Sequence, residues 1–236
     1  MTNAGWTRST RWAGSTRGFG PWIALSGAAT MAAAALQLSA DASFERFLGP
    51  LPPALTVAAA GVAGLGALRL LERRGFWRRA CSSRTLRGLA VASLATVPFA
   101  AAAIAIDVAV GFPEDTNVSW PAAWLFYPAI ASVVEVALHL LPLAGLVWLS
   151  RWRWHGRALD ARTWAVMVPV AALEPLAQVW LGSALPAYVA PHVFLFGLVQ
   201  LCLLRRYGYL PMLWFRLCYY LLWHLLWGLA RLELLF

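Results

Sequence analysis

The stretch that decides the fold is PAAWLFYPAIASVVEVALHLLPLAGLVWL, residues Pro121–Leu149. Its side chains are almost all apolar, and it contains a single acidic residue, Glu135, and a single histidine, His139. A helix that crosses the hydrocarbon core of a bilayer needs about 20 such residues. The stretch therefore predicts a membrane-spanning helix with one polar stripe, because residues four apart lie on the same face of a helix.

Six further apolar runs lie on the two sides of this stretch. They are Pro21–Ala40, Pro52–Leu68, Gly88–Ile106, Thr163–Gly182, Pro186–Leu204 and Leu210–Ala230. The first run has a second interpretation as a cleaved signal peptide, because arginines precede it and small residues end it. We favour a retained helix, since the apolar core of a signal peptide is only about 7–15 residues long.

The composition of the 236-residue chain excludes several classes of protein. Only 12% of the residues are charged and 61% are hydrophobic, whereas a soluble domain carries about 25% charged residues. Three cysteines are too few for a scaffold built on disulfides. The net charge of +9 comes from arginines in short clusters between apolar runs. We therefore expect a lipid bilayer, and no nucleic acid, as the partner of this chain.

The distribution of the arginines predicts the orientation of the helices. With the N-terminus inside, 16 of the 19 arginines fall on inner segments. Arg46 falls on an outer loop and Arg231 on an outer tail, while the acidic segment Asp107–Trp120 forms another outer loop. An excess of basic residues marks cytoplasmic loops. We predict an all-α, polytopic transmembrane bundle of about seven helices, integral to the plasma (inner) membrane of a bacterium.

A single domain accounts for most of the chain. Residues 1–19 are basic and rich in Gly, Ser and Thr, and we expect a flexible cytoplasmic tail there. Residues 20–236 are expected to form one transmembrane bundle. Within it, residues 21–106 are rich in Gly and Ala, which let helices approach closely, and are the predicted scaffold. Residues 121–230 carry the polar side chains and are the predicted catalytic helices.

Polar side chains recur at four-residue spacing in the later runs. They are Glu135 and His139, then Glu174 and Gln178, then Arg216, Tyr220 and His224, with His192 alone in the sixth run. An ionised side chain at the centre of a bilayer costs about 2.5–3.5 kcal/mol. We therefore expect these residues to face inward and to meet in one polar chamber. Two simpler interpretations stay open: histidines that only join helices by hydrogen bonds, and an Arg216 that extends to the membrane surface.

Depth along the helices refines this expectation. With a rise of about 1.5 Å per residue, four of the polar residues are expected in one layer near the middle of the bilayer. They are Glu135, Glu174, His192 and His224. Arg216 and His139 are expected closer to the cytoplasmic side, behind that layer.

The chemistry of these residue types favours hydrolysis. A glutamate beside a histidine in a dry cavity is suited to activate a water molecule. Imidazoles and the guanidinium of Arg216 are suited to stabilise the oxyanion that forms on an attacked carbonyl. Glutamate and histidine are also zinc ligands, but the chain has no H-E-x-x-H pattern. We therefore predict no cofactor and keep a metal ion as an alternative.

The last part of the chain resembles the end of a known family. The segments are Phe194-Leu-Phe-Gly197, Leu204-Arg-Arg-Tyr-Gly208-Tyr-Leu-Pro and His224-Leu-Leu-Trp-Gly228. In order and character they are similar to the CPBP family, which comprises CAAX prenyl proteases and bacteriocin-processing, or Abi-type, proteins. The resemblance implies a multi-helix intramembrane endopeptidase of glutamic type, in which a Glu activates water and His or Asn residues complete the site.

Two motifs of that family are altered in this chain. The first is a Glu pair with an Arg four residues after the second Glu, and here Glu135 stands alone and is followed by His139. The second has a His four residues after a Phe, and here the matching segment runs from Glu174 to Gln178 without a His. The third motif contains a His, which His224 matches.

The predicted function is an intramembrane endopeptidase that cleaves a membrane protein or a lipidated peptide. Glu135 is the predicted base and Glu174 a second acid or hydrogen-bond partner. His192 and His224 are predicted to stabilise the tetrahedral intermediate, and His139 to orient Glu135. Two alternatives remain. One is a non-catalytic relative that serves as an assembly or immunity partner, and the other is a proton-coupled carrier, although the chain shows no inverted repeat.

Overall fold

The computed structural model describes residues 19–39, 42–78, 82–154, 157–182 and 185–235. The predicted cytoplasmic tail lies outside these residues, apart from Phe19. Across the described ranges the chain is helical and contains no β-strand, which confirms the all-α fold class.

Each of the seven predicted runs falls on one long helical segment. Five segments are single α-helices: α1 (Gly20–Leu38), α3 (Pro53–Arg73), α4 (Ser82–Val110), α7 (Ala161–Trp180) and α8 (Pro186–Tyr207). In the other two, a π-helical turn joins two α-helices: α5 (Ala123–Val134), η4 (Glu135–Leu140) and α6 (Leu141–Leu149), and α9 (Tyr209–Tyr219), η5 (Tyr220–Trp227) and α10 (Gly228–Leu234). The short α2 (Glu45–Leu48) lies between α1 and α3.

Five of the described segments are long and apolar enough to cross a membrane. They are α1, α3, α4, the combined segment Ala123–Leu149, and α8. Large apolar side chains cover their outer faces, such as Leu38 and Val62, which are 89% and 75% exposed. A large apolar surface of this kind is unfavourable in water and suited to hydrocarbon. The chain therefore has the build of a membrane protein.

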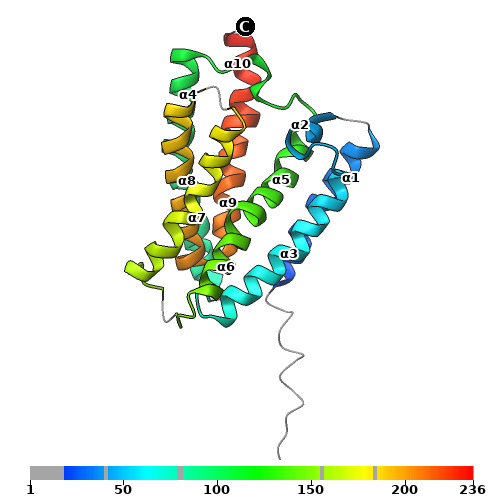
Figure 1. Ribbon diagram of the computed structural model, residues 1–236. Helices are drawn as coiled ribbons and strands as arrows, with labels where there is room; N and C mark the ends of the chain where they lie inside the picture. Colours follow the sequence, from blue (N-terminus) through cyan, green and yellow to red (C-terminus); the bar gives the residue numbers. More distant parts are fainter. Residues whose placement is uncertain (1–18, 40–41, 79–81, 155–156, 183–184, 236) are drawn as a thin grey trace, which may run out of the picture.

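The helical segments run alternately up and down the bundle (Figure 1). α1 packs against α3 and α5, α4 packs against α8 and α9, and α7 packs against α8. The connections that follow α3, α6 and α8 lie at the same end as the start of α1, at the bottom of Figure 1. The main arginine clusters lie in these connections or on the helix ends next to them, so the basic residues gather at one end of the bundle. That this end faces the cytoplasm stays a prediction.

A buried ion pair joins two helices near the opposite end. Asp107, which was expected in an outer loop, belongs to α4, and Arg231, which was expected on an outer tail, belongs to α10. Arg231 donates from Nε to Asp107 Oδ2 at 2.7 Å and from Nη2 to Oδ1 at 2.9 Å, and both side chains are fully buried. It also donates to the carbonyl oxygens of Phe112 and Pro113. The two expectations were wrong because pairing lets both helices continue through charged residues.

The start of α7 is fixed by a side-chain cap. The carboxylate of Asp160 accepts hydrogen bonds from Thr163 Oγ1 at 2.6 Å and from the Thr163 backbone N–H at 2.9 Å. Such a cap satisfies an N–H group that the first turn of a helix leaves without a partner. The same two donors hold the pKa of Asp160 below its ordinary value. The cap fixes the register of the helix that carries Glu174.

Glycines allow a close contact between α1 and α3 in the predicted scaffold. A Cβ at Gly64 on α3 would overlap Cζ2 of Trp22 on α1 and lie 2.7 Å from Val136 Cγ2. Trp22 also donates from Nε1 to the carbonyl oxygen of Gly61 at 2.9 Å, so its indole is fixed against α3. At these two glycines the close approach that the sequence suggested is present.

Replacing Gly64 with alanine should lower the free energy of unfolding by about 1–3 kcal/mol, because the added methyl group overpacks the contact with Trp22. The matched control is G66A on the same helix, where a Cβ meets nothing within 4 Å. Thermal unfolding in detergent, followed by circular dichroism, measures both. Equal unfolding midpoints for G64A and G66A would contradict this packing.

Candidate functional site

One guanidinium at the centre of the bundle organises a buried polar cluster. Arg216 on α9 donates from Nε to Glu135 Oε1 at 2.5 Å. Its Nη1 donates to Glu174 Oε1 at 2.9 Å and to the hydroxyl of Tyr220 at 3.2 Å. Its Nη2 donates to Glu174 Oε2 at 2.6 Å and to Gln200 Oε1 at 2.9 Å. These bonds use all five N–H donors of an arginine, so Arg216 has none left for another partner.

Four helical segments deliver these side chains to one place. Glu135 opens the π-helical turn η4, Glu174 lies on α7, Gln200 on α8 and Arg216 on α9. The four residues are between 0% and 6% exposed. Gln200 also donates from Nε2 to Glu135 Oε1, which closes the ring of hydrogen bonds. Because Arg216 is fully engaged inside the bundle, the interpretation in which it extends to the membrane surface is wrong.

His139 sits between the two carboxylates without a hydrogen bond. Its Nδ1 lies 3.8 Å from Glu135 Oε2, and its Nε2 lies 3.7 Å from Glu174 Oε2. Both ring nitrogens and Glu135 Oε2 are buried and have no hydrogen-bond partner among the described residues. Buried polar atoms are almost always paired, so atoms left over in this way need an explanation. They are the polar atoms of the cluster whose hydrogen-bonding capacity is not used by the described residues.

The charges of the cluster nearly balance. Two carboxylates face one guanidinium, and a protonated His139 would make the group neutral. A charge taken out of water is tolerated only when it is paired and hydrogen-bonded. Both carboxylates therefore face the guanidinium of Arg216 at the centre of the cluster.

The structure places His224 outside this cluster. Its Nδ1 lies 2.6 Å from Asn117 Oδ1, and its ring stacks on Tyr127 with centroids 4.5 Å apart. Tyr220 separates it from Arg216, with the Tyr220 and His224 ring centroids 5.0 Å apart.

His192 also lies apart from the cluster and has partners of its own. Its Nδ1 is 3.0 Å from the hydroxyl of Tyr188, and its Nε2 is 3.2 Å from the hydroxyl of Tyr219. Of the five predicted site residues, Glu135, His139 and Glu174 come together, and His192 and His224 do not join them. Their predicted catalytic roles stay predictions.

Sequence reasoning overlooked Gln200 as a member of the site. It is fully buried in the middle of an apolar run, and an amide there carries the same kind of desolvation cost that drew attention to the glutamates. The free-energy cost of burying the amide of Gln200 was therefore the signal that could have identified it as a member of the site. Gln178, which was singled out instead, lies at the edge of the cluster, with its Nε2 3.5 Å from Glu174 Oε1.

Two of the three polar stripes coincide, wholly or in part, with π-helical turns. Glu135 and His139 lie in η4, and Tyr220 and His224 lie in η5. In a π-helix the backbone hydrogen bonds skip one residue more than in an α-helix, and such turns are frequent at functional sites. The two wide turns therefore mark the same region of the bundle as the polar side chains do.

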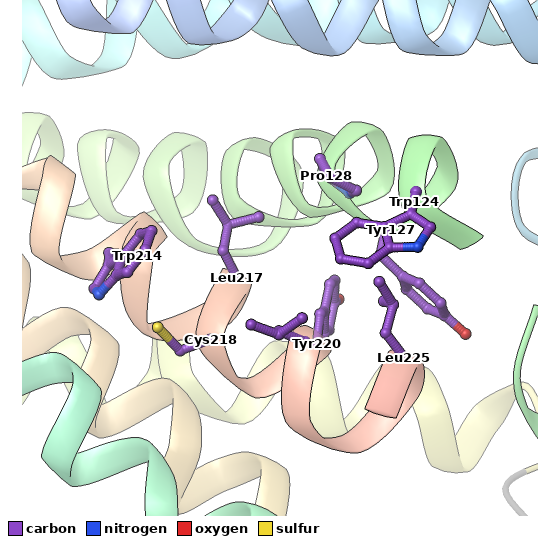
Figure 2. A pocket seen from close by; sticks show the side chains of 9 residues that line it. Trp124, Tyr127, Pro128, Trp214, Leu217, Cys218, Tyr220 and Leu225 are labelled. Carbon is purple, nitrogen blue, oxygen red and sulfur yellow. The ribbon is translucent and has the colours of Figure 1, made fainter. Parts of the chain in front are cut away.

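An apolar pocket of about 190 Å³ lies between α5 and the last helical segment, beside the cluster. Figure 2 shows the side chains of the two segments facing a common space. The lining residues are Trp124, Tyr127, Pro128, Trp214, Leu217, Cys218, Tyr220, Leu221 and Leu225. Tyr220 belongs to both features, because it lines the pocket and its hydroxyl accepts a hydrogen bond from Arg216. The pocket and the polar cluster are thus one side chain apart.

Comparison with family models, with curated proteins and with solved structures found no match for this chain. Among the residues that the structure describes, no group of three or more His, Cys, Asp or Glu side chains is arranged to hold a metal ion.

Replacing Arg216 with methionine should lower the free energy of unfolding by about 3–5 kcal/mol, because it leaves Glu135 and Glu174 buried without a counter-charge. The triple variant E135Q/E174Q/R216M removes the uncompensated charges and should recover part of this loss. R206Q, at an exposed arginine near the end of α8, is the control. Unfolding in detergent measures all three, and an R216M protein as stable as R206Q would contradict the assignment of Arg216 as the centre of the cluster.

Proposed function

We propose that this protein is an intramembrane endopeptidase in which Glu135 activates a water molecule. The observation that carries the proposal is the buried Glu135 Oε2, which has no hydrogen-bond partner among the described residues and faces an equally unpartnered His139. A carboxylate with one oxygen fixed and the other open is the arrangement that a general base requires.

The proposed reaction needs no group beyond water and these side chains. Glu135 Oε2 accepts a proton from water while the water oxygen attacks the carbonyl carbon of a peptide bond. The C–N bond then breaks as the proton passes from Glu135 to the leaving nitrogen. The products are a carboxylic acid, which keeps the second proton of the water, and an amine, and proton exchange between them gives a carboxylate and an ammonium group. Glu135 ends the cycle without the proton that it took from water.

The neighbours of Glu135 have separate roles in this proposal. Arg216 and Gln200 are positioning residues, because both hold Glu135 Oε1 and so direct Oε2 toward His139. Glu174 fixes the other side of Arg216 through two hydrogen bonds. Since every N–H of Arg216 is engaged, the oxyanion is assigned to an N–H of His139 and not to Arg216.

Tyr220 connects the proposed site with the apolar pocket. Its hydroxyl accepts from Arg216, which leaves its own proton available to a substrate carbonyl. The lining of the pocket suits the apolar side chains of a membrane protein or the lipid group of a lipidated peptide. The resemblance to the CPBP family supports the same reaction and the same substrates, and we place the protein in the plasma membrane of a bacterium, where the arginine-rich end would face the cytoplasm.

Replacing Glu135 with glutamine should reduce peptide cleavage by roughly 10²–10⁴-fold, because an amide cannot accept the proton from water. Cells that express the wild-type chain, E135Q or the exposed control E233Q are compared by mapping new N-termini of membrane proteins. Termini present with the wild-type chain and with E233Q, but absent with E135Q, identify substrates. Cleavage of such a substrate by the purified protein in ¹⁸O-labelled water should place one ¹⁸O in the new carboxylate, and full cleavage by E135Q would rule out this mechanism.

The histidines offer a second prediction, because only His139 lies between the carboxylates. H139F should abolish cleavage of the substrate found above, whereas H192F should keep cleavage within about tenfold of the wild-type rate. Rates are measured with the purified variants at equal folded concentration. Loss of cleavage in H192F with full cleavage in H139F would reverse the assignment of the two histidines.

A second candidate function is a non-catalytic assembly or immunity partner. The observation that favours it is the saturation of Arg216, because a guanidinium with all donors engaged by buried partners also describes a purely structural lock between helices. In that case E135Q would change the stability of the protein and leave the set of membrane-protein N-termini unchanged.

A further inference from the structure

A second pocket lies at the arginine-rich end of the bundle, away from the buried cluster. Its volume is about 420 Å³, and it is lined by Arg74, Trp148, Leu149 and Arg151. Arg74 follows the last turn of α3, whereas the other three residues lie at the end of α6 and just after it. The ends of α3 and α6 lie near each other at the bottom of Figure 1. Two elements that are far apart in sequence therefore form this pocket.

The pocket combines two positive charges with an apolar wall. No ion pair joins Arg74 or Arg151 to an acidic side chain of the described chain. Trp148 and Leu149 beside them are 54% and 65% exposed. Exposed tryptophans are typical of the level at which lipid headgroups meet hydrocarbon. The two guanidiniums are thus available to an anion at the membrane surface.

The backbone that carries these arginines is held in place. The backbone N–H of Trp154 donates to the carbonyl oxygen of Arg74 at 3.3 Å, which joins the two connections. Gly75 has φ of +74°, and a Cβ there would overlap the carbonyl oxygen of Trp154. Arg205 donates to the carbonyl oxygens of Gly75 and Phe76. The backbone next to Arg74 is therefore fixed before a ligand arrives, which reduces the entropy that binding must overcome.

Arg151 adopts an unusual backbone conformation at the rim of this pocket. Its φ is +52°, and it is the only residue other than glycine with positive φ among the described ranges. A left-handed backbone is unfavourable for a side chain with a Cβ, and such strained residues gather at ligand sites. Glycine would adopt this conformation with less strain than arginine does.

We propose that this pocket binds the phosphate group of an anionic glycerophospholipid at the arginine-rich face of the membrane. Guanidinium groups recognise phosphate oxygens with paired N–H donors, and basic pockets between helices bind anionic headgroups. Arg74 and Arg151 contact the phosphate from two sides. Trp148 and Leu149 contact the glycerol and the first carbons of the acyl chains, which a free phosphate ion lacks.

The test compares unfolding midpoints of purified protein in detergent with added lipid. The probes are phosphatidylglycerol, phosphatidylcholine and, as the lipid-free source of the same chemistry, glycerol phosphate. The variants are R151G, R74Q and the matched control R153Q, an exposed arginine of the same connection that does not line the pocket. R151G removes the guanidinium and relieves the backbone strain together, so this variant folds at least as well as the wild type without lipid.

Phosphatidylglycerol should raise the midpoint of the wild-type protein and of R153Q by about 5 °C, and that of R151G and R74Q by less than half as much. Phosphatidylcholine and glycerol phosphate should give smaller shifts in the wild-type protein. An equal phosphatidylglycerol shift in R151G, R74Q and wild type would overturn the site. A wild-type shift from glycerol phosphate as large as that from phosphatidylglycerol would overturn the lipid as its ligand.

Discussion

The second half of the bundle depends on the hydrogen bonds and ion pairs that Arg216 makes with two glutamates in the buried centre of the bundle. Each of the three charges alone would be too costly to bury, and together they are tolerable only with good geometry and further hydrogen bonds. Glu135, Glu174 and Gln200 supply that geometry from three other helical segments. The positions of α5, α7, α8 and α9 relative to one another are therefore tied to a single side chain.

Most of the fold followed from the sequence because bilayers impose a simple rule on apolar length. Each of the seven apolar runs became a helical segment. The predicted ends of two helices, before Asp107 and before Arg231, were wrong. A rule based on hydropathy ends a helix at a charged residue, and it does not foresee that these two charges pair. The π-helical turns had no signal in the spacing of the residues.

The candidate site was predictable in part for a related reason. The cost of burying charge correctly suggested that Glu135, His139 and Glu174 would meet, and the four-residue spacing gave the faces that they share. Depth alone then grouped His192 and His224 with Glu135 and Glu174 and placed His139 and Arg216 behind that layer, whereas the structure sets His139 and Arg216 directly against the two glutamates. Depth fixes only the position of a residue along the membrane normal. The distance between two side chains depends also on the rotation of each helix about its axis. Tyr219 and Asn117 hold those two imidazoles in places of their own.

The centre of the bundle and its arginine-rich end use arginine in three different ways. Arg216 is enclosed by acidic partners, Arg205 is anchored on backbone carbonyl oxygens, and Arg74 is left open at a pocket. Burial and partners, and not residue type, decide which of these guanidiniums holds the fold and which remains available to a ligand. This is why a count of arginines predicts the orientation of a membrane protein but not the roles of its arginines.

The last helical segment is fastened at two heights, by Arg216 to Glu135 and Glu174 and by Arg231 to Asp107. These anchors are 15 residues apart, about 22 Å along a helix. Because of these two anchors, the segment cannot shift along its own axis without breaking a buried ion pair.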